Sequence, residues 1–257
     1  MLFHACHFNS GQITPGVIIS MTSKIKLFTF PYAGGSANLF RPWRRTLNTN
    51  IDLCPVELPG RGVLYPLPMY RSIEQAVNEI GKTFKYIDSD FALFGHSMGA
   101  IIVFELLKYF REQNIKMPLR VFFSGRKAPH MNNEKKKDYY SMDDAGFRKE
   151  VILLGGTPPE VFQNEELASL FLPVLKNDFI MCENYIPSFD GNKFNIDFSV
   201  LTGTTEGYTL DELNAYGIYT SKPVEIKTFE GDHFFIKDSQ SAVIDYINLT
   251  LSGLISQ

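Results

Sequence analysis

The sequence is poor in cysteine. Three occur in 257 residues, Cys6, Cys54 and Cys182, and they are isolated and odd in number. This argues against a disulfide framework and for a reducing compartment, and hence for a cytoplasmic protein. No C-x-x-C pair and no cluster of histidine with cysteine suggests a zinc site. Cys54 lies in an apolar run and is expected to be packed in the core.

A long apolar run and a dominant charge are missing as well. No apolar run approaches the roughly 18 residues that span a bilayer, and the N-terminal segment lacks the basic and apolar regions of a secretory signal. The net charge is −3, and the one basic run, Lys135–Lys137, fits a solvated loop. Such a chain offers no electrostatic footprint for nucleic acid or for an anionic membrane.

Six apolar runs are expected to form strands. Most are apolar on both faces and are bounded by glycine, proline, aspartate or asparagine, as expected of buried parallel strands. Helical periodicity lies between them, for example from Ile73 to Phe84 with Ser72 as N-cap. This alternation predicts an α/β fold with a mostly parallel, doubly wound sheet. The six runs are residues 25–30, 51–57, 91–94, 119–124, 198–201 and 224–229.

One region interrupts this alternation. Residues 126–189 show no clear strand but three helix-like stretches with several glycine or proline breaks, and Pro173 is expected to interrupt the last of them. We interpret this insertion as a helical lid over the carboxyl edge of the sheet; a peripheral helical decoration is the alternative. The domain is expected to cover residues 24–257. Residues 1–23 are expected to be a disordered leader or an extension foreign to the domain.

The most informative motif runs from Gly95 to Gly99 and has the form G-x-S-x-G. It follows an apolar strand-like run and precedes a helix-like one, which is the context of a nucleophile elbow in an α/β-hydrolase. The two glycines leave room for a sharp turn. The helix start beyond Ser97 supplies N–H groups and a positive dipole end for a developing oxyanion. Ser97 is therefore the candidate nucleophile.

A serine hydroxyl needs a base that removes its proton. Of five histidines, His233 directly follows the last strand-like run and precedes the last helix, where an α/β-hydrolase carries its base. We assign His233 as the base; a histidine on a surface loop is the alternative.

A carboxylate should orient that imidazole, and the fold places it after the preceding strand. Glu206 is the first carboxylate there and is our choice, while Asp211, a few residues on, is the rival. Asp232 is adjacent to His233 in the chain, so its side chain is not expected to reach the ring. We expect it to brace the loop.

The oxyanion hole requires two backbone N–H groups. One should come from Met98, directly after the nucleophile. The other is expected in the loop Pro31–Ala37, which follows the first strand; Gly34-Gly35 in it fits a plain turn as well. Because this loop is expected to face Ser97, Ala33 is the candidate donor. The loop lacks the G-x-G-x-x-G fingerprint and the chain lacks P-loop spacing, so nucleotide binding has no support.

Four motifs in this order resemble those of the type II thioesterases that accompany non-ribosomal peptide and polyketide synthetases. They are Phe-Pro-Tyr-Ala-Gly-Gly-Ser at 30–36, Glu-Leu-Pro-Gly-Arg-Gly at 57–62, Gly-His-Ser-Met-Gly-Ala at 95–100 and Gly-Asp-His-Phe-Phe at 231–235. The likeness runs from about Lys24 to the C-terminus. The family usually has Asp at the acid position, whereas this chain has Glu206.

The resemblance implies an α/β-hydrolase with a helical lid, whose nucleophile is Ser97, base His233 and oxyanion donors Ala33 and Met98. It implies hydrolysis of acyl or aminoacyl thioesters on the 4′-phosphopantetheine arm of carrier proteins, which releases misprimed or stalled groups. The arm belongs to the substrate, and no metal or organic cofactor is required. A monomer is expected. The competing readings are a hydrolase of small esters or lipids and a carrier-binding scaffold with weak or no catalysis.

Overall fold

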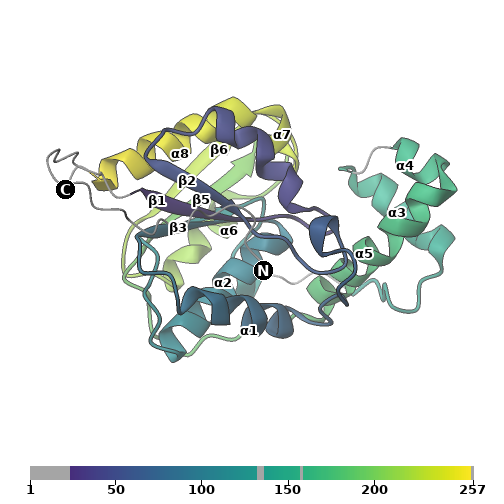
Figure 1. The fold of residues 1–257 in the computed structure, drawn as a ribbon, viewed down its shortest axis with the longest axis horizontal. Helices are drawn as coiled ribbons and strands as arrows, with labels where there is room; N and C mark the ends of the chain where they lie inside the picture. Colours follow the sequence, from purple (N-terminus) through teal and green to yellow (C-terminus); the bar gives the residue numbers. More distant parts are fainter. Residues whose placement is uncertain (1–23, 132–135, 157–158, 256–257) are drawn as a thin grey trace, which may run out of the picture.

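The computed structural model describes residues 24–131, 136–156 and 159–255, and the extension expected at 1–23 lies outside them. Within these residues six parallel strands form one sheet in the order β2-β1-β3-β4-β5-β6 (Figure 1). The expected α/β-hydrolase fold with a mostly parallel sheet is thus confirmed. The strands are β1 Ile25–Phe30, β2 Ile51–Pro55, β3 Phe91–His96, β4 Arg120–Ser124, β5 Asp197–Gly203 and β6 Val224–Phe229.

Helices cover both faces of the sheet (Figure 1). One face packs against α1, α2 and α6, and the other against η1, α7 and α8. The helix α2 is apolar on most of its sides because it lies between the sheet and α1. The predicted N-cap of α1 is confirmed, since the Ser72 side chain accepts a hydrogen bond from the Gln75 amide at 3.1 Å. The bounds are η1 Ala37–Arg45, α1 Ile73–Phe84, α2 Met98–Glu112, α6 Leu210–Asn214, α7 Phe235–Asp238 and α8 Gln240–Ile255.

The cysteines agree only in part with the expectation of isolated thiols. Cys54 is fully buried in β2, as predicted for a core residue. Its sulfur, however, takes part in a disulfide bond, so the prediction was wrong on this point. Cys182 lies half-buried in the last turn of the helix Glu165–Asn184.

Among the described residues, three α-helices follow β4 and precede β5, and they extend beyond one end of the sheet (Figure 1). They are α3 Asp144–Leu154, α4 Pro159–Gln163 and α5 Glu165–Asn184, and we call them the lid helices. They share a small hydrophobic cluster of their own, to which Phe147, Val151 and Leu172 belong. The lid helices therefore have packing of their own in addition to the contacts of α5 with the main core. That they cover the site as a lid stays a prediction.

The expected break at Pro173 is wrong, because α5 is one uninterrupted helix of 20 residues that contains it. Proline removes the single hydrogen bond that its own N–H would donate one turn back. Leu172 and Leu175, which flank it, are buried in the lid cluster and hold the helix in place.

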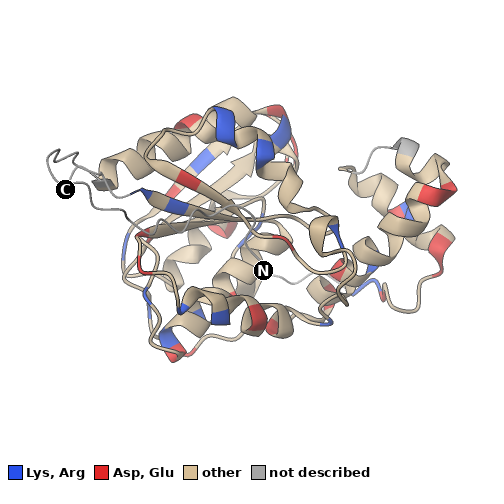
Figure 2. Cartoon of the chain, viewed as in Figure 1, with Lys and Arg blue, Asp and Glu red and all other residues tan. Residues whose placement is uncertain are grey.

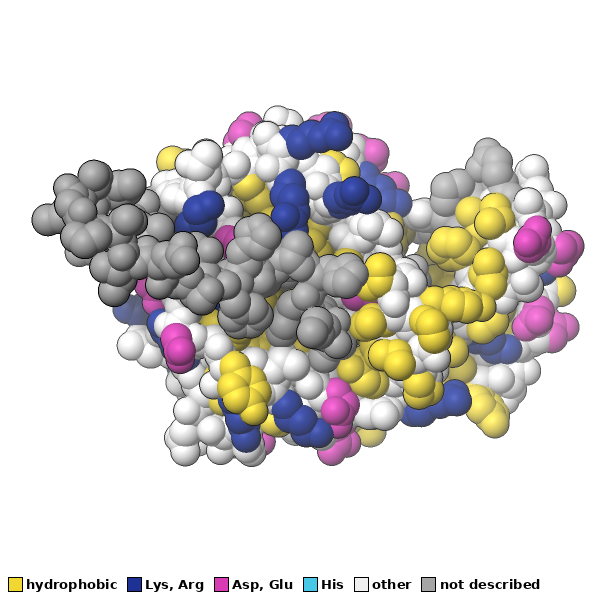
Figure 3. Space-filling view, in the orientation of Figure 1, with side chains coloured by type: hydrophobic (Ala, Val, Ile, Leu, Met, Phe, Trp, Pro, Cys, Tyr) yellow, Lys and Arg dark blue, Asp and Glu magenta, His cyan; other side chains and the backbone are white. Residues whose placement is uncertain are grey.

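The surface carries both charges and exposed apolar groups. Figure 2 shows Lys and Arg interspersed with Asp and Glu over the sheet domain and the lid helices alike. Hydrophobic side chains gather at the lid end of the molecule (Figure 3), and the lid helices expose Leu153, Leu170 and Phe171. No helix among the described residues is both long and apolar enough to cross a membrane.

Candidate active site

Ser97 stands at the carboxyl end of β3 in a strained backbone conformation. Its φ of 55° and ψ of −110° are unusual for a residue with a side chain. A Cβ on Gly95 would lie 2.3 Å from the Gly99 carbonyl oxygen, and one on Gly99 would lie 2.2 Å from the Phe30 carbonyl oxygen. A side chain at either glycine would therefore clash with the neighbouring backbone. The turn has the geometry of the nucleophile elbow that the sequence indicates.

The elbow is fastened to the neighbouring strand by Ser124, which the sequence motifs do not single out. The Ser97 amide donates to the Ser124 carbonyl at 2.8 Å, and the Ser124 hydroxyl lies 2.8 Å from Nδ1 of His96. The last residue of β4 thus fixes both the nucleophile's backbone and the histidine before it.

His233 and Glu206 meet at the same edge of the sheet. Nδ1 of His233 lies 2.5 Å from Oε1 of Glu206. The second carboxylate oxygen accepts from the Thr202 hydroxyl at 2.9 Å and from the Gly203 amide at 3.1 Å. The Glu206 side chain is 3% exposed and the His233 side chain 32%. A buried carboxylate held on both oxygens can therefore fix the tautomer and the orientation of a ring that reaches solvent.

The loops that carry these two residues are joined by hydrogen bonds. The amide and the hydroxyl of Thr205 both donate to the Gly231 carbonyl at 3.0 Å, and the Gly231 amide donates to the Thr204 hydroxyl at 3.1 Å. A Cβ on Gly203 would lie 2.3 Å from the Asp232 carbonyl oxygen. These contacts hold the two loops together, and Glu206 meets the imidazole across them.

The other acidic candidates lie elsewhere. Asp211 is exposed in the first turn of α6, and among the described residues its carboxylate forms no hydrogen bond or ion pair with His233. Asp232 accepts a hydrogen bond from the Phe234 amide at 2.7 Å, so it braces the loop as expected. Of the two carboxylates proposed for the triad, the structure brings Glu206 to the histidine.

Both expected oxyanion donors lie beside Ser97. Met98 begins α2, and Ala33 lines the same cavity as Ser97. The loop Pro31–Ala37, which we call the oxyanion loop, turns through a hydrogen bond from the Gly35 amide to the Tyr32 carbonyl at 2.9 Å. Within the described part of the chain, neither the Ala33 nor the Met98 amide donates a hydrogen bond. Their role as oxyanion donors stays a prediction.

His96 is fully buried behind the site, with its ring centroid 5.1 Å from that of His233. Burial, reinforced by the positive charge that His233 can carry, holds the pKa of His96 well below its ordinary value of 6.5. His96 therefore stays neutral in the folded protein and does not oppose the formation of an imidazolium on His233.

This burial predicts a loss of stability in mild acid. Unfolded His96 takes up a proton near pH 6.5 while folded His96 does not, so the free energy of unfolding falls as the pH drops below that value. Between pH 7.5 and 5.5 we expect wild type to lose about 1 kcal/mol more than His96→Gln. Urea unfolding at both pH values measures this, and equal losses in the two proteins would contradict it.

Two cavities open beside the nucleophile, of about 260 and 420 Å³. Both are lined by Ala33, Ser97, Arg126, Leu154 and Phe179. The smaller one also reaches His233 and the apolar lid residues, and the larger one reaches basic side chains of the segment after β4. Since Leu154 and Phe179 come from α3 and α5, the lid helices supply part of the wall at Ser97.

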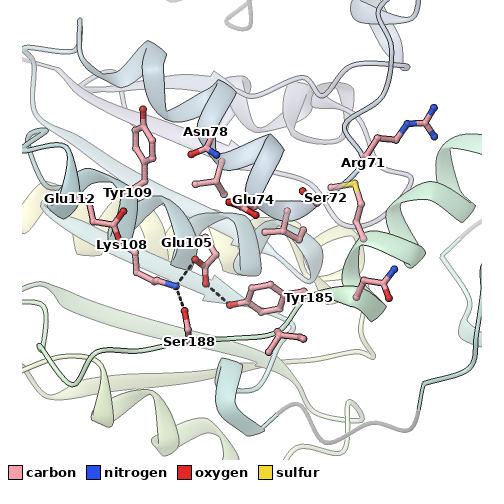
Figure 4. A pocket seen from close by; sticks show the side chains of 15 residues that line it. Arg71, Ser72, Glu74, Asn78, Glu105, Lys108, Tyr109, Glu112, Tyr185 and Ser188 are labelled. Atoms are coloured by element: carbon pink, nitrogen blue, oxygen red, sulfur yellow. Dashed lines mark hydrogen bonds and ion pairs between the residues drawn. The ribbon is translucent and has the colours of Figure 1, made fainter.

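A third cavity, of about 470 Å³, lies between α1, α2 and the end of α5 (Figure 4). Polar side chains in its wall bind one another. Glu105 accepts a hydrogen bond from the Tyr185 hydroxyl at 2.6 Å and forms an ion pair with Lys108 at 2.7 Å. Lys108 also donates to the Ser188 hydroxyl at 3.0 Å. Ser97 does not line this cavity. Its network fastens the end of α5 to α2.

Comparison with known proteins gives the family. The family model described as thioesterase domain matches residues 25–251. The chain belongs to the thioesterase family. The thioesterase is 34% identical over 238 residues to a protein of Brevibacillus parabrevis named linear gramicidin dehydrogenase LgrE, with 91% of this chain and 90% of the relative covered.

Two solved structures resemble the thioesterase closely. ClbQ from the colibactin NRPS/PKS pathway is 34% identical with a TM-score of 0.85, over 90% of this chain and 98% of that one. YbtT, titled a type II thioesterase from the yersiniabactin NRPS/PKS pathway, is 30% identical with a TM-score of 0.76, over 88% and 92%. The resemblance stated from four motifs is thereby confirmed.

Proposed function

We propose that this thioesterase removes acyl or aminoacyl groups from the 4′-phosphopantetheine arm of carrier proteins and so restores misprimed or stalled non-ribosomal peptide or polyketide synthetases. The contact of 2.5 Å between His233 and Glu206, at the cavity that Ser97 lines, is the observation that supports the chemistry most. The pathway names of ClbQ and YbtT support the class of substrate.

The proposed reaction has two halves. The Ser97 oxygen attacks the thioester carbonyl carbon while His233 takes the hydroxyl proton, and the N–H groups of Ala33 and Met98 stabilise the oxyanion. The C–S bond then breaks, and the departing carrier sulfur receives the proton from His233. A thiol with a pKa of about 8.5 leaves far more readily than an alkoxide.

Water completes the cycle. It attacks the acyl group on Ser97 while His233 takes a proton from it, and this proton passes to the serine oxygen as the acid departs. Glu206 keeps the ring oriented and stabilises its positive charge in both halves. The proposal needs no metal or organic cofactor, because the pantetheine arm arrives with the substrate.

The substrate class is tested by comparing one acyl group on different carriers. We expect kcat/KM for an acetyl-loaded carrier protein to exceed that for free acetyl-pantetheine at least about tenfold, since contacts with the protein partner add binding free energy. Steady-state rates on both, and on p-nitrophenyl acetate, measure this. Faster turnover of the free ester would favour the competing hydrolase of small esters or lipids.

The word dehydrogenase in the name of LgrE suggests a second activity, but the sequence does not favour it. The G-x-G-x-x-G fingerprint of dinucleotide binding does not occur in the oxyanion loop or elsewhere in the chain. The cytoplasmic location and the monomeric state remain expectations that go with the proposed function.

A further inference from the structure

We propose that Arg61 and Asp178 are positioning residues that hold the oxyanion loop in its working shape, so that lid helix α5 sets the geometry of the oxyanion hole. The inference rests on the proposed hydrolytic function of Ser97. It concerns a pair of side chains separated by 117 residues in the chain and brought together by the fold.

The two side chains form a buried, bidentate ion pair. Nη1 of Arg61 donates to Oδ2 of Asp178 at 2.6 Å, and Nη2 donates to Oδ1 at 2.8 Å. The Arg61 side chain is 7% exposed and that of Asp178 1%. Asp178 belongs to α5, whereas Arg61 follows β2 in the Leu-Pro-Gly-Arg-Gly motif. The pair thus connects a lid helix to the sheet domain.

Each member of the pair also holds one peptide group of the oxyanion loop. Oδ2 of Asp178 accepts from the Gly34 amide at 2.7 Å, and Nη1 of Arg61 donates to the Gly35 carbonyl at 3.1 Å. Two consecutive residues are therefore fixed, one through its N–H and the other through its C=O. Because the Gly34 amide is already engaged, the N–H of Ala33 is the neighbouring group that the loop can offer to an oxyanion.

Packing presses the same loop against α5. Gly34 has a φ of +77°, and a Cβ there would lie 2.3 Å from Cδ1 of Leu175. Leu175 and Asp178 are one turn apart in α5 and so contact the loop from the same side of the helix. At the other end of the loop the Ala37 amide donates to the Glu57 carboxylate at 3.1 Å.

The cost of burying charge argues that the pair serves geometry rather than stability. Apolar residues of similar size often replace a buried ion pair at no loss of stability, whereas removal of one partner leaves an uncompensated charge. A bidentate pair fixes direction as well as distance, which packing of apolar groups does not. An oxyanion donor needs such placement, because its contribution depends on a distance of about 3 Å to the developing charge.

The test uses two changes to the pair. Asp178→Asn keeps the shape but removes the charge, and the double variant Arg61→Met with Asp178→Leu removes both charges together, which avoids an unpaired buried ion. The control is Tyr185→Phe, which removes the hydrogen bond between the end of α5 and Glu105 without touching the oxyanion loop. The substrate is S-acetyl-N-acetylcysteamine, a simple thioester.

We expect kcat to fall about 10- to 100-fold in both variants of the pair while KM changes less than about twofold. Affinity for a trifluoromethyl ketone, whose serine adduct carries an oxyanion, should fall by the same factor as kcat/KM. The control should stay within about twofold of wild type in all three quantities. A merely structural pair would lower the thermal midpoint without this parallel loss of kcat and ketone affinity.

Wild-type kcat and ketone affinity in the folded double variant would overturn the inference, as would a raised KM with unchanged kcat. If the double variant does not unfold cooperatively and is therefore not properly folded, Asp178→Asn alone decides, by its kcat and its affinity for the ketone. These outcomes are separate from failure of the proposed function. That failure would appear in the wild type itself, as an absence of thioester hydrolysis or of preference for carrier-bound groups.

Discussion

Replacement of Ser97 by alanine should abolish release of acetyl groups from an acylated carrier protein, with a loss in kcat of at least about 10⁴-fold. The hydroxyl is the proposed nucleophile, and no other hydroxyl stands on the elbow between β3 and α2. Binding of the carrier should be unchanged, because the substitution removes one oxygen atom from the wall of a cavity. Rates by discontinuous assay and affinities by calorimetry measure the two effects.

The control for this variant is Ser221→Ala, which should retain activity, because Ser221 precedes β6 and lines neither cavity at Ser97. Undiminished turnover in Ser97→Ala would remove this serine from the mechanism. Loss of carrier affinity in step with activity would instead indicate that the variant is misfolded, which circular dichroism checks independently.

Replacement of Glu206 by glutamine should lower kcat about 10³- to 10⁴-fold. The amide group can present an N–H to Nδ1 of His233, which favours the wrong tautomer, and it carries no charge to stabilise the imidazolium. The amide should still fit, since Thr202 and Gly203 hold the other oxygen of the side chain. Steady-state kinetics on the acetyl-loaded carrier measure the loss.

Asp211→Asn is the matched comparison, because it removes the rival carboxylate by the same chemical change. We expect it to stay within about twofold of wild type, since Asp211 is exposed on α6. A large loss in Asp211→Asn together with normal rates in Glu206→Gln would reverse the assignment.

The sheet and the order of the functional loops were predictable because they depend on local patterns. Buried parallel strands are apolar on both faces, and β3 has all six of its residues buried. Once the strands are in order, their carboxyl ends meet at one edge, and Ser97 and His233 each follow a strand there. The same argument predicts the place of Glu206 beside His233, although aspartate is the family's usual residue.

Contacts between segments far apart in the chain could not be predicted from the sequence. Nothing in the pattern around Arg61 indicates that its partner is Asp178, because the pairing exists only after α5 packs on the oxyanion loop. Ser124 was missed for the same reason, since its contacts with Ser97 and His96 follow from the register of β3 with β4. The rule that proline interrupts a helix did not hold at Pro173, because packing within the lid helices compensates for the one lost hydrogen bond.

The most direct test of the proposed chemistry is labelling by a fluorophosphonate probe, followed by mass spectrometry of the digested protein. The account predicts one covalent adduct on Ser97 in the wild type, formed much more slowly in His233→Ala and in Glu206→Gln. The absence of an adduct, an adduct on another residue, or labelling of His233→Ala at the wild-type rate would contradict it.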